Sequence, residues 1–176
     1  MLSRDHLVRR RMRTFLTALK ALLYLFAALL FFGWLAFRVR RLDFIVGVLP
    51  TWTEIPGIIL VAAGGALLFL CFGAFVVQGR GTPLPLDPPT KLVVLGPYKY
   101  VRNPIHIAWV TLFIGLGLYL RSPSILLFAL AFFIVCYVYV LWVEEPGLKK
   151  RFKTEYEEYC KAVPRYVPRL DSRRKV

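Results

Sequence analysis

The stretch Gly79–His106, GRGTPLPLDPPTKLVVLGPYKYVRNPIH, is a polar segment between long apolar runs, and it holds half of the 12 prolines. Pro83, Pro85, Pro88 and Pro89 exclude a regular helix there and favour a stiff, extended course. Membrane spans are normally joined by short turns, so a connection of this length indicates a function. Polar backbone at membrane depth persists only where it is buried in protein or lines a cavity. The segment is therefore predicted to build a cofactor and substrate site at the membrane surface.

The rest of the chain has the composition of a membrane protein. Apolar residues make up 58% of the 176 residues, which is too high for a soluble domain of this size. A helix needs about 20 apolar residues to cross a bilayer. Four runs approach or exceed that length, and we expect spans at residues 15–37, 55–77, 105–120 (short for a straight span) and 123–143. The predicted fold is a single all-α membrane domain with about four transmembrane helices, a cytoplasmic loop and a C-terminal amphipathic helix.

The first apolar run is expected to remain in the mature protein. It is too long for the apolar core of a signal peptide, and arginines follow it instead of a small-residue cleavage site.

The basic residues predict how the chain is oriented in the membrane. Four spans place the N-terminus, the long polar segment and the C-terminal tail on one side, and 19 of the 24 Lys and Arg residues lie there. The positive-inside rule then puts both termini and the long segment in the cytoplasm. Three arginines on the other side do not fit the positive-inside rule, unless part of the first loop returns to the surface: Arg38, Arg40 and Arg41.

The net charge of +14 is interpreted as attraction to anionic lipid headgroups. The basic residues flank the spans, and the sequence contains no recognisable motif that would read a nucleic-acid groove. We therefore expect no nucleic-acid partner. The cysteines Cys71, Cys136 and Cys160 are scattered, and His6 and His106 are the only histidines. Neither a disulfide framework nor a metal site is expected, and the cysteines are interpreted as packing residues.

Small residues in two spans suggest close helix contacts. The sequence AAGGA at residues 62–66 is interpreted as a packing surface. For Gly115 and Gly117 two interpretations stay open. Their missing side chains could allow close helix packing, or they could leave room for the edge of a bound ligand.

Two prolines are expected to set helix boundaries on the predicted cytoplasmic side. Pro104 suits the first turn of the third span, so Asn103 is expected either to cap that helix or to contact a ligand. Pro146 follows Glu144 and Glu145, and it predicts a break or kink there, with Pro146 at the start of a second helix.

The tail helix after Pro146 is predicted to be amphipathic. Its apolar face holds Leu148, Phe152, Tyr156, Tyr159 and Val163 at helical spacing. We expect this helix either to lie in the membrane interface or to pack on the long polar segment.

Glu144 and Glu145 stand at the end of a span, where carboxylates are costly unless they are hydrated, paired or functional. The simpler alternative to a ligand site is that they are interfacial carboxylates pairing with Lys149 or Arg102.

Taken together, the motifs resemble the isoprenylcysteine carboxyl methyltransferase family and the related phospholipid N-methyltransferases. The pattern is GTPxPxDPPxxLVxxGPYxYVRNP, then Gly-x-Gly, then Glu-Glu, then LxxxFxxEYxxYxxxVPR, within residues 79–168. The resemblance implies an integral membrane enzyme that uses S-adenosylmethionine to methylate a lipid or lipidated acceptor.

The resemblance also implies site residues. Arg102 and Glu144 are the catalytic candidates, with Arg102 pairing with an anionic group and Glu144 favouring the cationic cofactor. The implied cofactor-pocket residues are Lys91, Leu92, Val93, Tyr98, Asn103, Pro104, Ile105, His106, Gly115, Gly117, Glu144 and Glu145.

The chain departs from the prenylcysteine pattern at two places. RHPxY is usual in those enzymes, where this chain reads Arg102-Asn103-Pro104-Ile105-His106, and their substrate-binding arginine corresponds to Val140. The identity of the acceptor therefore stays open. An amine acceptor would have to lose a proton, to Glu144 or His106, whereas a carboxylate would need no base.

Three other functions compete with the methyltransferase. An NADPH-dependent membrane reductase of the sterol-reductase type shares a similar C-terminal layout. A non-catalytic membrane subunit would bind neither cofactor. Transport is disfavoured, because the spans contain almost no charge.

Overall fold

A computed structural model describes residues 4–79 and 89–168 of the chain, and every regular element in these ranges is helical. The α-helices are α1 (Arg4–Val39), α2 (Asp43–Val46), α3 (Glu54–Ala74), α4 (Pro104–Tyr119), α5 (Pro123–Tyr139) and α6 (Glu145–Ala162). Short 3-10 turns occupy Arg40–Leu42, Thr51–Thr53 and Gly96–Lys99, and π-helical turns occupy Phe75–Gly79 and Val140–Glu144. The predicted all-α fold is confirmed. Pro83, Pro85 and Pro88 lie outside the described residues.

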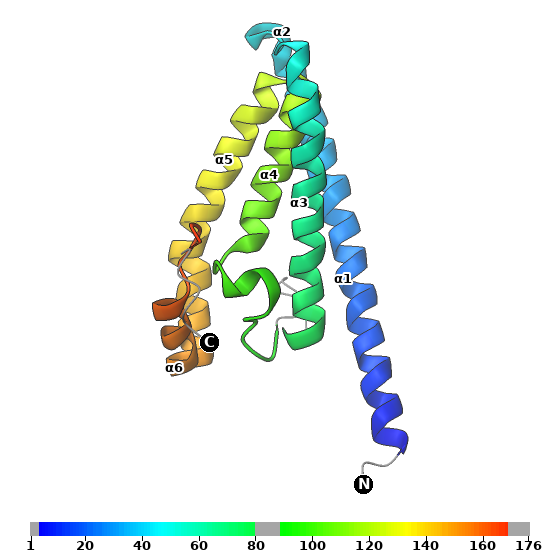
Figure 1. The fold of residues 1–176 in the computed structure, drawn as a ribbon, viewed down its shortest axis with the longest axis vertical. Coiled ribbons are helices and arrows are strands. Elements are labelled where there is room, and N and C mark those ends of the chain that lie inside the picture. The colour runs from blue at the N-terminus through cyan, green and yellow to red at the C-terminus, as the bar shows by residue number, and fades with distance from the viewer. Residues whose placement is uncertain (1–3, 80–88, 169–176) are drawn as a thin grey trace.

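Helices α1, α3, α4 and α5 run along the long axis of the molecule (Figure 1). At one end lie α2 and the turn between α4 and α5. Toward the other end lie the start of α1, the segment 89–103 and α6. The predicted cytoplasmic location of this second end stays a prediction.

In the described part of the chain, three helical stretches are long and apolar enough to cross a membrane: Thr14–Val46, Thr51–Gly79 and Pro123–Ala162. The shorter α4 has 16 residues, which at 1.5 Å per residue is about 24 Å, less than the roughly 30 Å of a hydrocarbon core. The stretch Pro123–Ala162 has 40 residues, about twice what a span needs. Its apolar part ends at Val143, so Glu144 and Glu145 follow the span. The helices fit a membrane protein.

Glycines allow α3 and α4 to cross closely. A Cβ built on Gly64 would lie 2.7 Å from the backbone nitrogen of Leu112, and one on Gly115 would lie 2.9 Å from the carbonyl oxygen of Gly57. Only residues without side chains fit at such contacts. Within residues 62–66 the packing interpretation is confirmed for Gly64 only, because the alanines are exposed and a Cβ on Gly65 would meet nothing within 4 Å.

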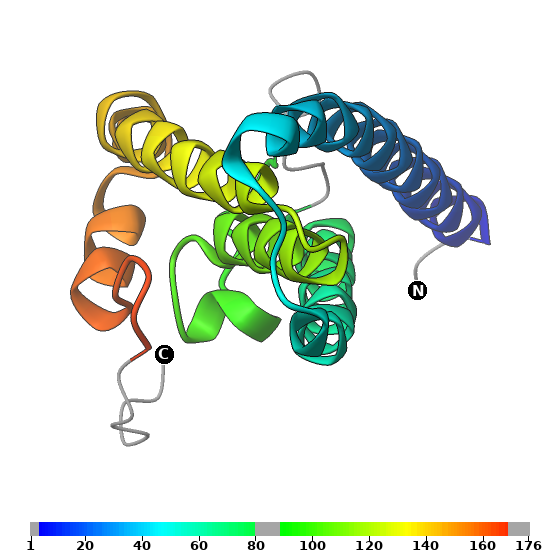
Figure 2. The same ribbon diagram turned by 90° about the horizontal axis from the view of Figure 1, so that it is seen from above.

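Helix α1 diverges from the other helices toward its N-terminus, as Figures 1 and 2 both show. Phe32, in its second half, enters the core and packs on Trp109, Phe113 and Phe132 with ring centroids 5.0, 5.7 and 5.4 Å apart. One end of α1 is thus fixed to the bundle, while the other end stands away from α5.

The second helix predicted to start at Pro146 is present, because α6 begins at Glu145 with the proline in its first turn, but the chain does not break there. Glu145 keeps α-helical angles (φ −61°, ψ −44°), and its N–H bonds to the carbonyl of Val140, five residues back. This π-helical turn widens the helix just before the proline, whose ring would otherwise clash with the preceding turn. Departure from helical geometry occurs later, at Lys153 (φ 47°, ψ −124°).

Candidate functional site

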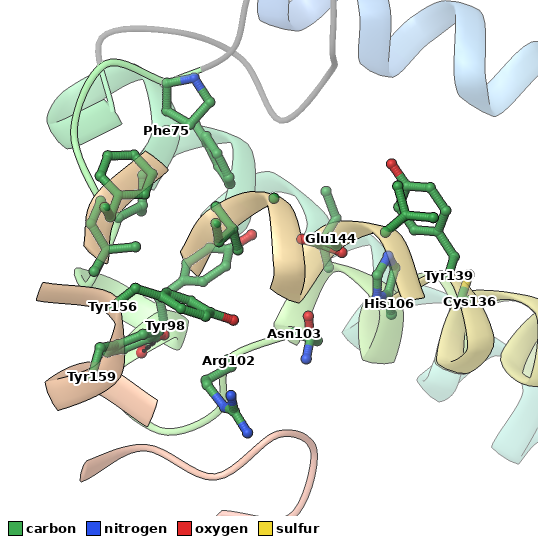
Figure 3. A pocket seen from close by; sticks show the side chains of 18 of the residues that line it. Phe75, Tyr98, Arg102, Asn103, His106, Cys136, Tyr139, Glu144, Tyr156 and Tyr159 are labelled. Atoms are coloured by element: carbon green, nitrogen blue, oxygen red, sulfur yellow. Dashed lines mark hydrogen bonds between the residues drawn. The ribbon is translucent and has the colours of Figure 1, made fainter. Parts of the chain in front are cut away.

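A cavity of about 580 Å³ lies where the segment 89–103, α4, α5 and α6 meet (Figure 3). Its volume is within the roughly 300–1,000 Å³ typical of small-molecule sites. The segment contributes Pro89, Leu92, Val93, Tyr98, Arg102 and Asn103. The helices contribute Phe32, Phe75, Ile105, His106, Trp109, Phe132, Cys136, Tyr139, Val143, Glu144, Gly147, Leu148, Arg151, Phe152, Tyr156 and Tyr159.

The cavity has chemically different ends. Arg102, Asn103 and Glu144 line it beside the tyrosines of α6. Phe32 and Phe132 line it deeper in the bundle, within the aromatic core. Phe132 is 12 residues before Glu144, which is about 18 Å along a helix. One continuous space therefore connects a polar end, beside Arg102 and Glu144, with an apolar end between helices.

Tyr98 fixes the polar segment against α3. Its ring packs edge-on against Phe75, with centroids 5.5 Å apart, and it shares a buried cluster with Cys71, Ala74 and Val93. Its carbonyl accepts a 2.7 Å hydrogen bond from the hydroxyl of Tyr159. Burial raises the pKa of Tyr98 well above its ordinary value, so the phenol stays neutral in this wall of the cavity.

The apolar face predicted for the tail helix is confirmed. Tyr156, Tyr159 and Val163 form a buried cluster with Leu92 of the polar segment, and Leu148 and Phe152 pack against this cluster. Of the two expected placements, the structure shows the one in which α6 packs on the segment.

Glu145 is engaged in ion pairs. Its carboxylate lies 3.1 Å from the guanidinium of Arg102 and accepts two hydrogen bonds, of 2.8 and 2.9 Å, from Arg165. Burial alone would raise the pKa of Glu145, but the bond from Arg165 and the charges of Arg102, Arg165 and Lys149 hold the pKa below its ordinary value. Glu145 therefore fits the simpler pairing alternative, with Arg102 as one partner.

Glu144 lines the cavity instead. Burial, and after it the negative charge of Glu145, raise the pKa of Glu144 to about 7. A carboxyl group with such a pKa changes charge near neutral pH, and a bound cation would favour its ionised form. The two consecutive glutamates thus have different surroundings.

Arg102 and Asn103 reach the cavity from the turn before α4. The Nη1 atom of Arg102 also lies 2.7 Å from the sulfur of Cys160, while its buried Nε has no hydrogen-bond partner among the described residues. Asn103 occupies the N-cap position of α4 without a side-chain cap, and its amide donates to the carbonyl of Arg165 at 3.4 Å. The predicted side-chain cap is thus absent.

His106 and Ile105, one helical turn or less into α4, also line the cavity. The Nδ1 atom of His106 is buried and has no hydrogen-bond partner in the described part of the chain. Buried polar atoms are normally paired, so this nitrogen is available to a ligand.

Several residues predicted for the site lie elsewhere. Gly115 meets the backbone of α3, and a Cβ on Gly117 would lie 2.6 Å from a side-chain carbon of Leu126. Both glycines therefore leave room for close packing of a neighbouring helix, and neither lines the cavity. Pro104 is buried beside the cavity without lining it, and Lys91 is exposed at a separate hollow with Gln78 and Glu155.

The sequence does not reveal the part of the wall formed by α1, α5 and the middle of α4. Phe32, Trp109, Phe132, Cys136 and Tyr139 are ordinary apolar or aromatic residues of spans, and no spacing marks them as ligand residues. Only the packing of helices distant in sequence brings them to one space.

Comparison with known proteins agrees with this architecture. The chain is 30% identical over 81 residues to the nickel-cobalt-cadmium resistance protein NccN of Alcaligenes xylosoxydans xylosoxydans, a match that covers 46% of this chain and 38% of that protein. The sequence model of the phospholipid methyltransferase family matches residues 52–155, more than half of the chain, including α3, α4 and α5. This match and the apolar helices support a membrane methyltransferase, and the chain belongs to the phospholipid methyltransferase family.

Proposed function

We propose that the protein transfers the methyl group of S-adenosylmethionine to a lipid or lipidated acceptor held in the bilayer. The observation that carries this proposal is the single cavity with a polar end at Glu144 and an apolar end at Phe32 and Phe132. A water-soluble cofactor and an apolar acceptor can meet in one such space, as methyl transfer requires.

The residues of the polar end fit the cofactor's groups. Glu144 would accept hydrogen bonds from an ammonium or ribose hydroxyl and favour positive charge, and Arg102 would pair with a carboxylate. The unpartnered Nδ1 of His106 and Nε of Arg102 offer further polar contacts. Tyr98, Tyr156 and Tyr159 supply aromatic surface for a flat base or a cation. When bound, the cofactor would supply an activated methyl group on a sulfonium leaving group.

The acceptor would approach from the bilayer between α1 and α5. Tyr139, at the end of α5, and Val143, in the π-helical turn after it, line the cavity yet are 45% and 54% exposed. Helix α1 diverges from the bundle at the same end of the molecule (Figures 1 and 2). This side of the cavity would therefore face lipid.

An amine headgroup fits the site better than a prenylcysteine carboxylate. Val140 stands where prenylcysteine enzymes have their substrate-binding arginine, and it is fully buried outside the cavity wall. The pKa of Glu144, raised by burial to about 7, suits a group that takes a proton from an ammonium acceptor before methyl transfer.

Titration calorimetry of the purified protein with S-adenosylmethionine and with NADPH tests this proposal. The methyltransferase predicts binding of S-adenosylmethionine alone. Binding of NADPH alone would favour the reductase, and binding of neither would favour a non-catalytic subunit.

A further inference from the structure

The last turn of α6 and the residues after it follow the polar segment of the cavity closely. The Tyr159 hydroxyl donates to the Tyr98 carbonyl at 2.7 Å, and the Arg102 and Asn103 amides donate to the carbonyls of Pro164 and Arg165 at 2.8 and 3.2 Å. We call Tyr159 together with residues 163–166 the C-terminal clamp. Its hydrogen bonds hold both ends of the stretch 98–103, which supplies three side chains to the cavity.

A second set of contacts ties the clamp to the end of α5 and the start of α6. Arg165 makes the bidentate pair with Glu145, and the same carboxylate lies 3.1 Å from Arg102. Tyr166 packs on Phe133 and Tyr137 of α5, with ring centroids 5.6 and 6.0 Å apart. The clamp thereby fixes the distance between the segment that carries Arg102 and the turn that carries the glutamates.

Arg165 itself does not line the cavity, so it can influence a ligand only through the residues that it holds. Glu145 is 8% exposed, and a buried carboxylate shared by two guanidinium groups sets the orientation of both. The clamp also lies beyond residue 155, where the match to the family model ends.

We infer that the C-terminal clamp is a positioning element of the cofactor site, in which Arg165 holds Glu145 and, through it, orients Arg102 toward the cavity. This inference rests on the proposed function, because its readout is the affinity for S-adenosylmethionine. Arg165 is a positioning residue and makes no contact with the cofactor.

The test measures the Kd for S-adenosylmethionine by calorimetry for full-length wild type, Arg165→Ala, Arg165→Lys and Lys161→Ala. Lys161 is an exposed residue in the last turn of α6, four residues before Arg165 and outside the clamp, so its replacement is a matched loss of one positive charge. We expect Arg165→Ala to weaken binding about 10- to 100-fold, the usual effect of losing a charged hydrogen-bonded pair. Arg165→Lys should recover part of the affinity, and Lys161→Ala should change nothing.

A double-mutant cycle with Glu145→Gln distinguishes positioning from general stability. If Arg165 acts through Glu145, Arg165→Ala should have little further effect on Kd in the Glu145→Gln background. The melting temperature of each variant without ligand, followed by tryptophan fluorescence, reports stability separately. Should Arg165→Ala fail to fold, Arg165→Lys and Glu145→Gln, which keep side-chain size, complete the test.

Wild-type affinity in folded Arg165→Ala protein, even with a lower melting temperature, would overturn the inference. Additive effects of the Arg165 and Glu145 substitutions would overturn it as well. Absence of binding in the wild type is a different result, since it would remove the proposed function itself.

Discussion

Glu144 and Glu145 are consecutive residues in different surroundings: Glu144 lines the cavity, while the Glu145 carboxylate is held by Arg165 at 2.8 and 2.9 Å. One helical step of about 100° separates their side chains. The acidic pair therefore divides into a proposed ligand-binding carboxylate and a carboxylate that joins three parts of the chain.

Replacing Glu144 should remove most of the affinity for S-adenosylmethionine. Glu144→Gln keeps the shape of the side chain but loses the charge that favours a cationic ligand, so we expect a Kd at least about tenfold higher. Calorimetry on detergent-purified protein measures this. Glu157→Gln, an exposed carboxylate of α6, is the matched control. Equal affinities of wild type and Glu144→Gln would show that Glu144 is not a cofactor ligand.

Cofactor affinity should rise with pH between about 5.5 and 7.5. The pKa of Glu144 in the protein without ligand is raised to about 7, mainly by burial, and a bound cation would lower it. Binding must then release protons in this range, because only the ionised carboxylate attracts the cation. Calorimetry in two buffers of different ionisation enthalpy counts the released protons. A pH-independent Kd, or the same release in Glu144→Gln, would contradict this assignment.

Gly115 should matter for helix packing and not for the cofactor. Gly115→Ala places a Cβ 2.5 Å from the backbone nitrogen of Val61, and such overpacking typically costs about 1–3 kcal/mol. Gly65→Ala is the control, since a Cβ there meets nothing within 4 Å. Thermal unfolding should show a lower melting temperature only for Gly115→Ala. Lost cofactor affinity in folded Gly115→Ala, with unchanged stability, would instead restore the ligand interpretation.

Filling the apolar end of the cavity should lower the catalytic efficiency for the lipid acceptor and leave the affinity for S-adenosylmethionine unchanged. Cys136 lines the cavity on α5, and Cys136→Phe should lower kcat/KM for a lipid acceptor about tenfold or more, as expected for a filled apolar pocket. The Kd for S-adenosylmethionine should stay near that of wild type. Leu130→Phe, on the exposed side of α5, should leave both quantities unchanged. An acceptor kcat/KM unaffected by Cys136→Phe would place the acceptor elsewhere.

The sequence was sufficient to predict the helices, because long apolar runs and their flanking charges have few alternatives in a membrane. The runs at 55–77 and 123–143 lie inside the stretches Thr51–Gly79 and Pro123–Ala162. At Pro146 the sequence predicts the start of a helix correctly but not the continuity of the chain, since the π-helical turn before the proline keeps it helical. A local rule for proline takes no account of the turn that precedes it.

The cavity was only partly predictable. Tyr98, Arg102 and Glu144 stand in recognisable motifs, and they line it together. Phe32 and Arg165 do not: the first reaches the site through helix packing, and the second acts through an ion pair formed across 20 residues. Gly115 and Gly117 show the converse, because a Gly-x-Gly pattern serves helix contact and ligand binding equally well in sequence.

Methyl transfer in membranes tests the central claim most directly. Membranes containing the wild-type protein or Glu144→Gln are incubated with methyl-labelled S-adenosylmethionine, and the extracted lipids are separated and identified. We predict a labelled amine-headgroup lipid that depends on the wild-type protein and falls at least about tenfold with Glu144→Gln. Equal labelling of membranes with and without the protein, for every lipid class, would contradict the account.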